Sequence, residues 1–454
     1  MSRNAAKRLF STLARQAESS ASGLIAPGQA LLAQRTTIQV LGGAGASAAK
    51  RAATCPCGRK FCMGRHYTTT TPAKAAEPAV AHDHAYADPE CVSSDLASRH
   101  QTVLKHFPTA LSVDDYITRV EIALAGYGFT GDNSIAMTNL CRDESCMILE
   151  DKIESVFGSC FSTHGLGGIL TCGVIGIKAG LSHSPIQGGK ERYVFFSFPH
   201  IAIDSNGEVG VISRPNRAGA SSACGALIAC TGHLKSEGLD ANLKQPGVHD
   251  PLEPEYSILK QRLARRLKHE GADEAGLDLV AVTKAAERTI TSDLEYLISK
   301  AVDPKKADYA VFTGVQIHNW ASNLEDESTP SLEFVGVGKS YVVVNGEKTF
   351  LDVHQVPALS PRQLKMLAKS SLDKDNSAVA ATPDGMIQEV PRDYLLKRLG
   401  GIVGKNVVSG KPGAWKDYVK TTFSEAHPNA PKLDDKLFAS DAPKDDGFTS
   451  FKKV

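Results

Sequence analysis

The sequence predicts an α/β fold in which a mixed sheet of four to five strands is flanked by helices, behind a disordered N-terminal leader. The main reason is alternation, because amphipathic helical patterns separate short apolar runs rich in β-branched and aromatic residues. Two Asn-Gly pairs, at 206–207 and 345–346, interrupt two of these runs and are typical of tight hairpin turns. The sheet is therefore expected to contain both helix-linked strands and hairpins.

The predicted folded domain covers residues 88–360, and its elements follow one another in a definite order. Helical periodicity covers 93–107 and 112–128, with Ser112 or Asp114 as the N-cap of the second helix. The sequence then predicts a buried strand at 135–140, a helix at 147–157, a hairpin over 192–214, helices from 221, 254 and 278, a strand at 307–319 and a hairpin over 331–353.

The two ends of the chain are expected to lie outside this domain. Residues 1–80 are predicted to be an organelle transit peptide and spacer, because residues 1–76 carry eleven Lys or Arg and a single acid, Glu18. Without that segment the chain has 40 basic and 49 acidic residues, which argues against nucleic acid or an anionic membrane as the main partner. Residues 361–454 are predicted to be a helical and polar C-terminal extension.

Hydropathy and the number of cysteines argue against a membrane-spanning protein and against a disulfide framework. No window approaches eighteen consecutive apolar residues, so no membrane span is expected. Ten cysteines in a chain without secretory features are expected to be thiols or metal ligands. Cys55, Cys57, Cys62 and His66 have the spacing of a small zinc knot, but they lie in the segment expected to be removed.

Three residues that suit a borderline or soft metal fall at the ends of predicted elements. Cys141 closes a strand, His200 ends another, and Cys224 begins a helix, where unpaired N–H groups favour a thiolate. Two cysteines, one histidine and an open fourth position form a catalytic zinc arrangement. Spacing alone leaves alternatives open, because Cys160 competes as the first ligand and His200 is compatible with a hydrogen-bonded core histidine.

Four segments together resemble the limiting-CO2-inducible protein B and C family, also called theta-type carbonic anhydrases. They are TNLCRDE, FFSFPHIAID, RPNR and SSACGAL, and the likeness covers roughly residues 110–355. The resemblance implies a β-carbonic-anhydrase-like fold and a Zn²⁺ ion bound by Cys141, His200 and Cys224. It also implies a homodimer or a hetero-oligomer with a paralogue, with the zinc site at an interface.

The resemblance further implies that Asp143 is the acidic partner of the zinc site. β-Class enzymes have the pattern C-x-D-x-R, and this chain departs from it because Ser145 stands in place of the arginine. Arg142 is the nearest candidate to pair with Asp143. Arg214 is its rival, because the predicted hairpin would return it to the neighbourhood of His200.

The predicted function is zinc-dependent, reversible hydration of carbon dioxide to bicarbonate, serving inorganic carbon acquisition in a CO2-concentrating mechanism. Zinc lowers the pKa of a bound water to roughly 7, and Asp143 would orient that water. The alternative is a catalytically weak zinc-binding scaffold or sensor that forms a complex with a paralogue for CO2 recapture. A thiol-based oxidoreductase would need a C-x-x-C pair or a clear cofactor fingerprint, and residues 81–454 contain neither.

The residues leave two alternatives each for the organelle that contains the protein and for the role of two histidines. The family association is with the chloroplast stroma, around the pyrenoid, and the leader would fit a mitochondrion nearly as well. His164 and His183 lie in glycine-rich loops and are candidates for proton shuttling or for ordinary surface histidines. The glycine-rich run 165–180 contains no phosphate-loop motif and is expected to pack its backbone closely around the site.

Overall fold

The computed structural model describes residues 94–214, 217, 219–243, 250–320, 331–356, 377–381, 387–391, 414–427, 429–438 and 448–451. All of them belong to one compact unit, residues 67–454. The predicted transit peptide and the zinc-knot residues lie outside the described residues.

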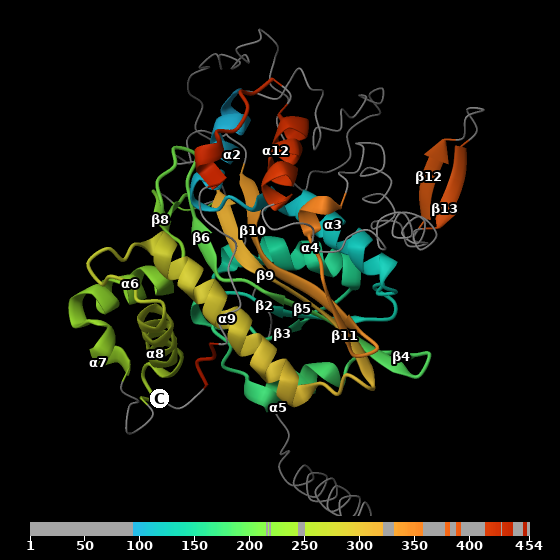
Figure 1. Ribbon diagram of the computed structural model, residues 1–454, viewed down its shortest axis with the longest axis horizontal. Helices are drawn as coiled ribbons and strands as arrows, with labels where there is room; N and C mark the ends of the chain where they lie inside the picture. Colours follow the sequence, from blue (N-terminus) through green and yellow to red (C-terminus); the bar gives the residue numbers. More distant parts are fainter. Residues whose placement is uncertain are drawn as a thin grey trace, which may run out of the picture. The chain divides into compact units, whose positions relative to one another are not determined.

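A nine-stranded mixed sheet forms the centre of this unit (Figure 1). Its strands are β1 (Ala110–Ser112), β2 (Ile135–Asn139), β3 (Phe161–Ser162), β4 (Ile186–Gln187), β5 (Lys190–Ser197), β6 (His200–Ala202), β9 (Ala307–Asn319), β10 (Leu332–Val344) and β11 (Glu347–Phe350). The main path runs β1-β10-β9-β5-β2-β3, with β11 beside β10, β4 beside β5 and β6 beside β9. Strands β3, β2, β5 and β9 are mutually parallel, and β10 is antiparallel to its neighbours.

The predicted α/β fold with a mixed sheet is confirmed, and the sheet is larger than the four to five strands expected. The additional strands β1, β3, β4 and β6 contain two or three residues each, too few to produce a periodic pattern in the sequence. The hairpin at Asn345-Gly346 is confirmed as β10–β11, and both turn residues have positive φ, 54° and 83°.

The other predicted hairpin is shorter than expected. The chain does turn at Asn206-Gly207, but only Ile203 and Val209 form a bridge across the turn. Beyond it, β7 (Val211–Ile212) pairs with β8 (Ser221–Ser222) instead of returning along β6, which pairs with β9. The helix expected from 221 therefore starts later, as α6 (Gly225–Glu237), with Cys224 as its N-cap.

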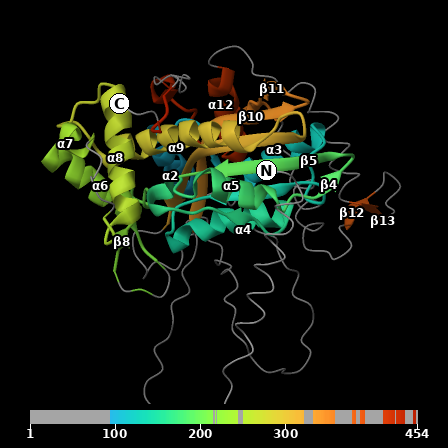
Figure 2. The ribbon, with the colours of Figure 1, turned by 90° about the horizontal axis from the view of Figure 1, so that it is seen from below.

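Helices cover both faces of the sheet. Helix α9 (Leu279–Ala301) crosses one face (Figures 1 and 2), where its Glu287 accepts a hydrogen bond from Thr313 at 3.0 Å. On the other face Phe157 of α4 (Met147–Phe157) packs on Phe196, which stacks on Phe312 of β9. Because Phe312 and Thr313 are neighbours in a strand and point to opposite faces, α4 and α9 lie on opposite sides of the sheet.

The remaining helices frame these two layers. Ser112 caps α3, as one of the two predicted alternatives, by accepting a hydrogen bond from Asp115 N–H at 3.3 Å. No helix in the described ranges combines the length and apolar character needed to cross a bilayer. The other helices are α2 (Ser94–His106), α3 (Val113–Gly126), α5 (Gly173–Leu181), α7 (Leu239–Leu243), α8 (Pro254–His269) and α12 (Ala414–Ala426), with 3₁₀ turns η2 (Glu144–Cys146), η3 (Leu166–Gly168), η4 (Val353–Gln355) and η5 (Asp435–Phe438).

The C-terminal segment differs from the helical extension that the sequence predicts. Its described residues contain one α-helix, α12, and an antiparallel pair of strands, β12 (Ser377–Ala381) and β13 (Ile387–Pro391). Val419 and Phe423 of α12 are buried in the same apolar cluster as Leu104 and Phe107 near α2. Part of the extension therefore belongs to the packed unit rather than lying apart from it.

Candidate metal centre

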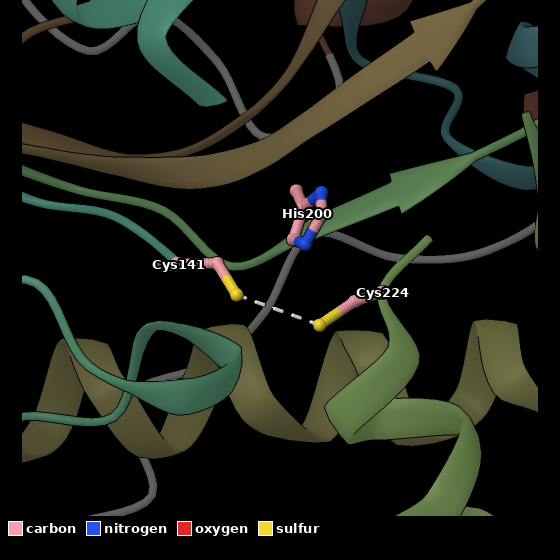
Figure 3. Close-up of side chains that lie close together, drawn as sticks. All are labelled: Cys141, His200 and Cys224. Carbon is pink, nitrogen blue, oxygen red and sulfur yellow. Dashed lines mark hydrogen bonds between the residues drawn. The ribbon is translucent and has the colours of Figure 1, made fainter. Parts of the chain in front are cut away.

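Cys141, His200 and Cys224 meet at the carboxyl ends of the central parallel strands (Figure 3). Cys141 follows β2, His200 begins β6, and Cys224 is the N-cap of α6. The two sulfur atoms lie 3.6 Å apart, and one ligand atom from each of the three residues lies within 4.8 Å of the other two. The parallel register of β2, β5 and β9 brings Cys141 and His200 together, because the carboxyl ends of these strands share one edge of the sheet. Cys224 lies beside them because the Ala202 N–H donates to the Ala223 carbonyl at 3.0 Å.

The donor set fits a zinc ion. Two sulfur ligands of tetrahedral zinc, with Zn–S bonds of about 2.3 Å, lie about 3.8 Å apart, close to the observed separation. His200 Nδ1 lies 2.9 Å from His318 Nε2, so the ring nitrogen turned toward the sulfurs in Figure 3 is Nε2. That Nε2 atom is buried and has no hydrogen-bond partner among the described residues. A buried, unpartnered imidazole nitrogen facing two thiols is what a third metal ligand requires.

The charge on the three side chains also suits a divalent cation. The Cys224 thiol donates to the Cys141 sulfur, which holds the pKa of Cys141 well below its usual range and raises the pKa of Cys224 well above it. Burial lowers the pKa of His200, but the negative charge of nearby cysteines outweighs it and raises the pKa well above 6.5. A cation bound here would replace these protons and neutralise both sulfurs at once.

Asp143 is held by Arg214. Arg214 Nη2 lies 2.8 Å from Oδ1 and 2.6 Å from Oδ2, and the Ser145 hydroxyl and N–H donate to Oδ1 at 2.7 and 3.1 Å. Burial raises the pKa of Asp143, but the bonds from Ser145 and Arg214 and the charge of His200 lower it to about 2. Arg214 is itself held by the Ser222 carbonyl at 3.1 Å. The carboxylate beside Cys141 is therefore ionised and fixed in orientation.

Arg142, the other predicted partner of Asp143, makes a different ion pair. Its Nε and Nη2 donate to the two oxygens of Glu255 on α8, at 2.9 and 2.6 Å. The side chain of Arg142 is 56% exposed, whereas that of Arg214 is 8% exposed. The expectation that Arg142 serves Asp143 is therefore corrected, because a carboxylate from a distant helix satisfies its guanidinium group.

Sequence reasoning missed two residues behind His200, the buried His318 and the half-buried Glu333. His318 Nδ1 lies 2.9 and 3.0 Å from the oxygens of Glu333, its direct partner in the β9–β10 register. Trp320 also donates to Glu333. If His318 Nδ1–H donates to the carboxylate, its Nε2 accepts the Nδ1–H of His200, and the lone pair on His200 Nε2 is left for a metal. The available signal was the polar residues Gln316, His318 and Asn319 at the end of a mostly apolar strand.

The His318–Glu333 pair also favours a protonated His318 next to His200. Burial lowers the pKa of His318, but the charge of Glu333 and its hydrogen bond raise it to about 9. A cation held by His200 would oppose a positive charge on His318, so metal binding and loss of this proton favour each other.

Cys146 forms a second cluster with His200 and His318, in which one ligand atom of each residue lies within 4.8 Å of the others. The two imidazole nitrogens are 2.9 Å apart, a hydrogen-bond distance. Two nitrogen ligands of one tetrahedral zinc ion would lie about 3.3 Å apart. We therefore interpret Cys146 as a buried thiol behind His200 and not as a ligand.

Residues 110–344 match the family described as limiting CO2-inducible proteins B/C beta carbonic anhydrases. The chain belongs to this family. It is 57% identical to the limiting CO2-inducible protein LCIB, whose crystal structure aligns over 56% of this chain and 99% of that one with a TM-score of 0.48. PtLCIB4, a homolog of LCIB, is 21% identical over 55% of this chain and 98% of its own, with a TM-score of 0.46. No curated protein matches the chain.

The structure also describes three other candidates that the sequence predicted, Cys160, His164 and His183. Cys160 belongs to neither metal cluster of the described residues, and burial raises the pKa of its thiol to about 12. His164 Nε2 lies 3.2 Å from Glu150 and lines a cavity of about 530 Å³ together with Arg142, so it remains a candidate for proton transfer. His183 is exposed and packs on the edge of Phe161.

The glycine-rich run packs closely, as expected. A Cβ atom on Gly165 would lie 2.2 Å from the Ile169 carbonyl oxygen, and one on Gly168 would lie 3.0 Å from the Phe198 carbonyl oxygen. Gly165 also forms a bridge with Cys141, so the absent side chains let this loop run directly alongside the first sulfur ligand.

Proposed function

We propose that the chain is a zinc-dependent carbonic anhydrase that interconverts carbon dioxide and bicarbonate. The observation that carries this proposal is the buried Cys141, His200 and Cys224 cluster, with an unpartnered imidazole nitrogen facing two sulfurs. The description of the family as beta carbonic anhydrases supports the same reaction.

Zinc, when bound by these three residues, would supply a Lewis acid that lowers the pKa of a water to about 7 for attack on carbon dioxide. Asp143 performs the orienting step. Its Oδ1 accepts three hydrogen bonds, whereas its Oδ2 accepts only from Arg214 among the described residues. Oδ2 therefore has a lone pair available for the proton of the attacking water.

Arg214 keeps that carboxylate in place. Its paired contacts hold both oxygens of Asp143, so the carboxylate is restrained from becoming a fourth metal ligand. The guanidinium also offsets the negative charge that two thiolates bring to the site. Both tasks require the arginine to be buried and directional, and its side chain is only 8% exposed.

A small apolar cluster adjoins the ligands and suits the substrate. Ala202 lies two residues after His200, and Ala223 directly precedes Cys224. Both alanines belong to one apolar cluster with Ile212 and Trp320. Carbon dioxide is small and carries no net charge, so an apolar wall beside the metal can hold it while bulk water is excluded.

The second candidate function is a zinc-binding scaffold or sensor with little turnover. The observation in its favour is the burial of the ligands, because Cys141, His200 and Cys224 are 4%, 0% and 1% exposed. Structural zinc sites are closed in this way, whereas catalytic sites keep a position open to water. In both cases we propose that the protein serves inorganic carbon acquisition as a homodimer or a hetero-oligomer with a paralogue.

We also propose a chloroplast location, in the stroma around the pyrenoid, with the mitochondrion as the alternative. The support is the family likeness and the basic, acid-poor composition of residues 1–76. A fluorescent protein fused behind residues 1–80 tests it. Signal in the chloroplast agrees with the proposal, and signal in the mitochondrion selects the alternative.

Zinc content and carbon dioxide hydration together test the reaction. Cys141→Ser is compared with Cys230→Ser, which changes an equally buried thiol in α6 that belongs to neither metal cluster. The enzyme proposal expects about one zinc per chain and hydration in the parent and in Cys230→Ser, with both lost in Cys141→Ser. Zinc without hydration in the parent would favour the scaffold, and a parent that binds no zinc would contradict both.

A further inference from the structure

The C-terminal residues 448–451 lie against helices α8 and α9, more than 140 residues away in sequence. The structure describes this segment, Phe-Thr-Ser-Phe, although the residues on either side of it are outside the described ranges (Figure 1). Its contacts are directional and involve charged groups, and none of them belongs to the metal centre.

The serine of the segment satisfies a buried charge. Asp293 of α9 is 0% exposed, and the Ser450 hydroxyl lies 2.7 and 2.6 Å from its two oxygens. The Ser450 N–H also donates to Asp293 at 3.0 Å. Apart from Ser450, Asp293 is paired with Arg262 at 3.3 Å. A buried carboxylate needs such donors, so the tail supplies part of what makes this charge tolerable inside the protein.

The two aromatic residues of the segment are each matched by an arginine of α8. The guanidinium of Arg266 lies 3.8 Å from the ring centroid of Phe448, and that of Arg262 lies 4.5 Å from the ring centroid of Phe451. Cation–π contacts of this kind favour an aromatic ring over an aliphatic side chain. Tyr296 of α9 packs on Phe451 from the other helix, with ring centroids 5.5 Å apart.

The backbone of the segment is also recognised. Arg265 Nη1 donates to the Ser450 carbonyl at 2.8 Å, so three consecutive polar groups of this serine, its N–H, its hydroxyl and its carbonyl, are all bound. Phe448, Ser450 and Phe451 thus each have a separate partner. Separate partners for individual side chains are typical of a recognised peptide, whereas general apolar packing does not require them.

We propose that α8 and α9 form a recognition groove for the motif Phe-x-Ser-Phe, and that the C-terminus of the same chain occupies it as a releasable strap. The groove is defined by Arg262, Arg265, Arg266, Asp293 and Tyr296. The strap is short and both of its phenylalanines keep some exposure, so its departure does not require the main core to open.

The groove is connected to the loop beside Cys141. Arg262, which lies over Phe451, also donates to the Leu170 carbonyl at 2.7 Å. Two residues earlier, the Gly168 carbonyl accepts a hydrogen bond from Asn139 at 2.6 Å, and Asn139 ends the strand that leads to Cys141. Docking of the strap and the order of loop 165–170 therefore share one arginine, and release of the strap would loosen that loop.

A labelled peptide of residues 445–454 tests the groove on the full chain. Phe448→Ala with Phe451→Ala in the chain disables its own strap, and the peptide should bind this variant at least about 10-fold more tightly than the parent, whose groove is filled. The same peptide carrying both alanines is the matched control and should not bind. Equal binding to parent and variant, or no binding to the variant while it remains folded by circular dichroism, would overturn the proposal.

Hydrogen exchange gives a second test, and its first part uses the unmodified chain alone. The Ser450 amide should exchange at least about 10-fold more slowly than in the free peptide, because it donates to Asp293. In the chain with the disabled strap, amides of residues 165–170 should exchange faster than in the parent. A Ser450 amide that exchanges at the free-peptide rate would contradict docking, and cross-links from tail to α8 found only between differently labelled copies would contradict docking within one chain.

Discussion

Two arginine–carboxylate pairs each include one of the two residues that follow Cys141 in the chain, and the two pairs differ in their exposure to solvent. Arg214 and Asp143 pair through contacts of 2.8 and 2.6 Å with side chains 8% and 14% exposed. Arg142 and Glu255 pair at 2.9 and 2.6 Å with side chains 56% and 21% exposed. The contact distances are nearly the same, although Arg214 uses one nitrogen for both oxygens and Arg142 uses two nitrogens. We expect the difference in their importance to come from position and burial.

The comparison shows that proximity in sequence does not decide which pair serves the site. Arg142 is adjacent to both Cys141 and Asp143, yet it pairs with a residue of α8. Arg214 lies 71 residues from Asp143 and reaches it because the chain leaves β6 by a tight turn. An exposed ion pair contributes little to stability, whereas a buried one that loses a partner leaves an uncompensated charge.

The largest expected effect comes from breaking the buried pair. Arg214→Gln should lower carbon dioxide hydration by about 10²-fold, because Asp143 loses its fixed orientation and becomes free to approach the metal. Zinc content should stay near the parent value, since none of the three ligands changes. Stopped-flow hydration assays with metal analysis measure both quantities. Hydration within threefold of the parent would show that the pair has no role in the reaction.

A smaller effect, on zinc affinity, is expected from changing His318 behind His200. His318→Leu removes the acceptor for His200 Nδ1–H, and it should weaken zinc binding by about 10- to 100-fold in chelator competition. His318→Gln restores a side-chain acceptor and should recover part of the loss. Equal zinc affinity in all three proteins would remove His318 and Glu333 from the account of the site.

The Arg214–Asp143 pair should also affect how the free energy of unfolding depends on pH in acid. The pKa of Asp143 is lowered from 3.8 to about 2 in the folded chain, so its contribution of about 2 kcal/mol is present above pH 4 and is lost as the pH falls toward 2. Arg214→Gln should reduce this acid dependence, measured as the free energy of unfolding against pH. A profile identical to that of the parent would contradict the assignment.

The smallest effect is expected for the exposed pair. Arg142→Gln should change hydration less than threefold and unfolding free energy by about 0.5 kcal/mol or less, because the pair is screened by solvent. This variant is the matched control for Arg214→Gln. A loss of activity as large as that of Arg214→Gln would reverse the conclusion drawn from burial.

The sequence was sufficient to predict the strands and turns that have long or distinctive residue patterns. The long apolar runs became β5, β9 and β10, and Asn345-Gly346 became the predicted turn, since both signals are local. Cys141, His200 and Cys224 lie together as the resemblance implied. Strands of two or three residues carry too little periodicity to predict, which explains the underestimated size of the sheet.

The missing parts of the candidate site depend on pairings that are not local. His318 and Glu333 meet because β9 and β10 pair in a particular register, and a shift of one residue would separate them. Glu255 could not be assigned to Arg142 without the position of α8. The contact of Ser450 with Asp293 spans 157 residues, beyond the reach of any spacing rule.

X-ray absorption at the zinc edge, on the zinc-loaded chain, tests the central claim most directly. The account predicts two sulfur neighbours at about 2.3 Å and lighter neighbours at about 2.0 Å that include one imidazole. Cys224→Ser should remove one sulfur neighbour, and Cys146→Ser should leave the spectrum unchanged. A site with three sulfurs, with one, or with sulfur lost in Cys146→Ser would contradict the ligand set on which the proposed function rests.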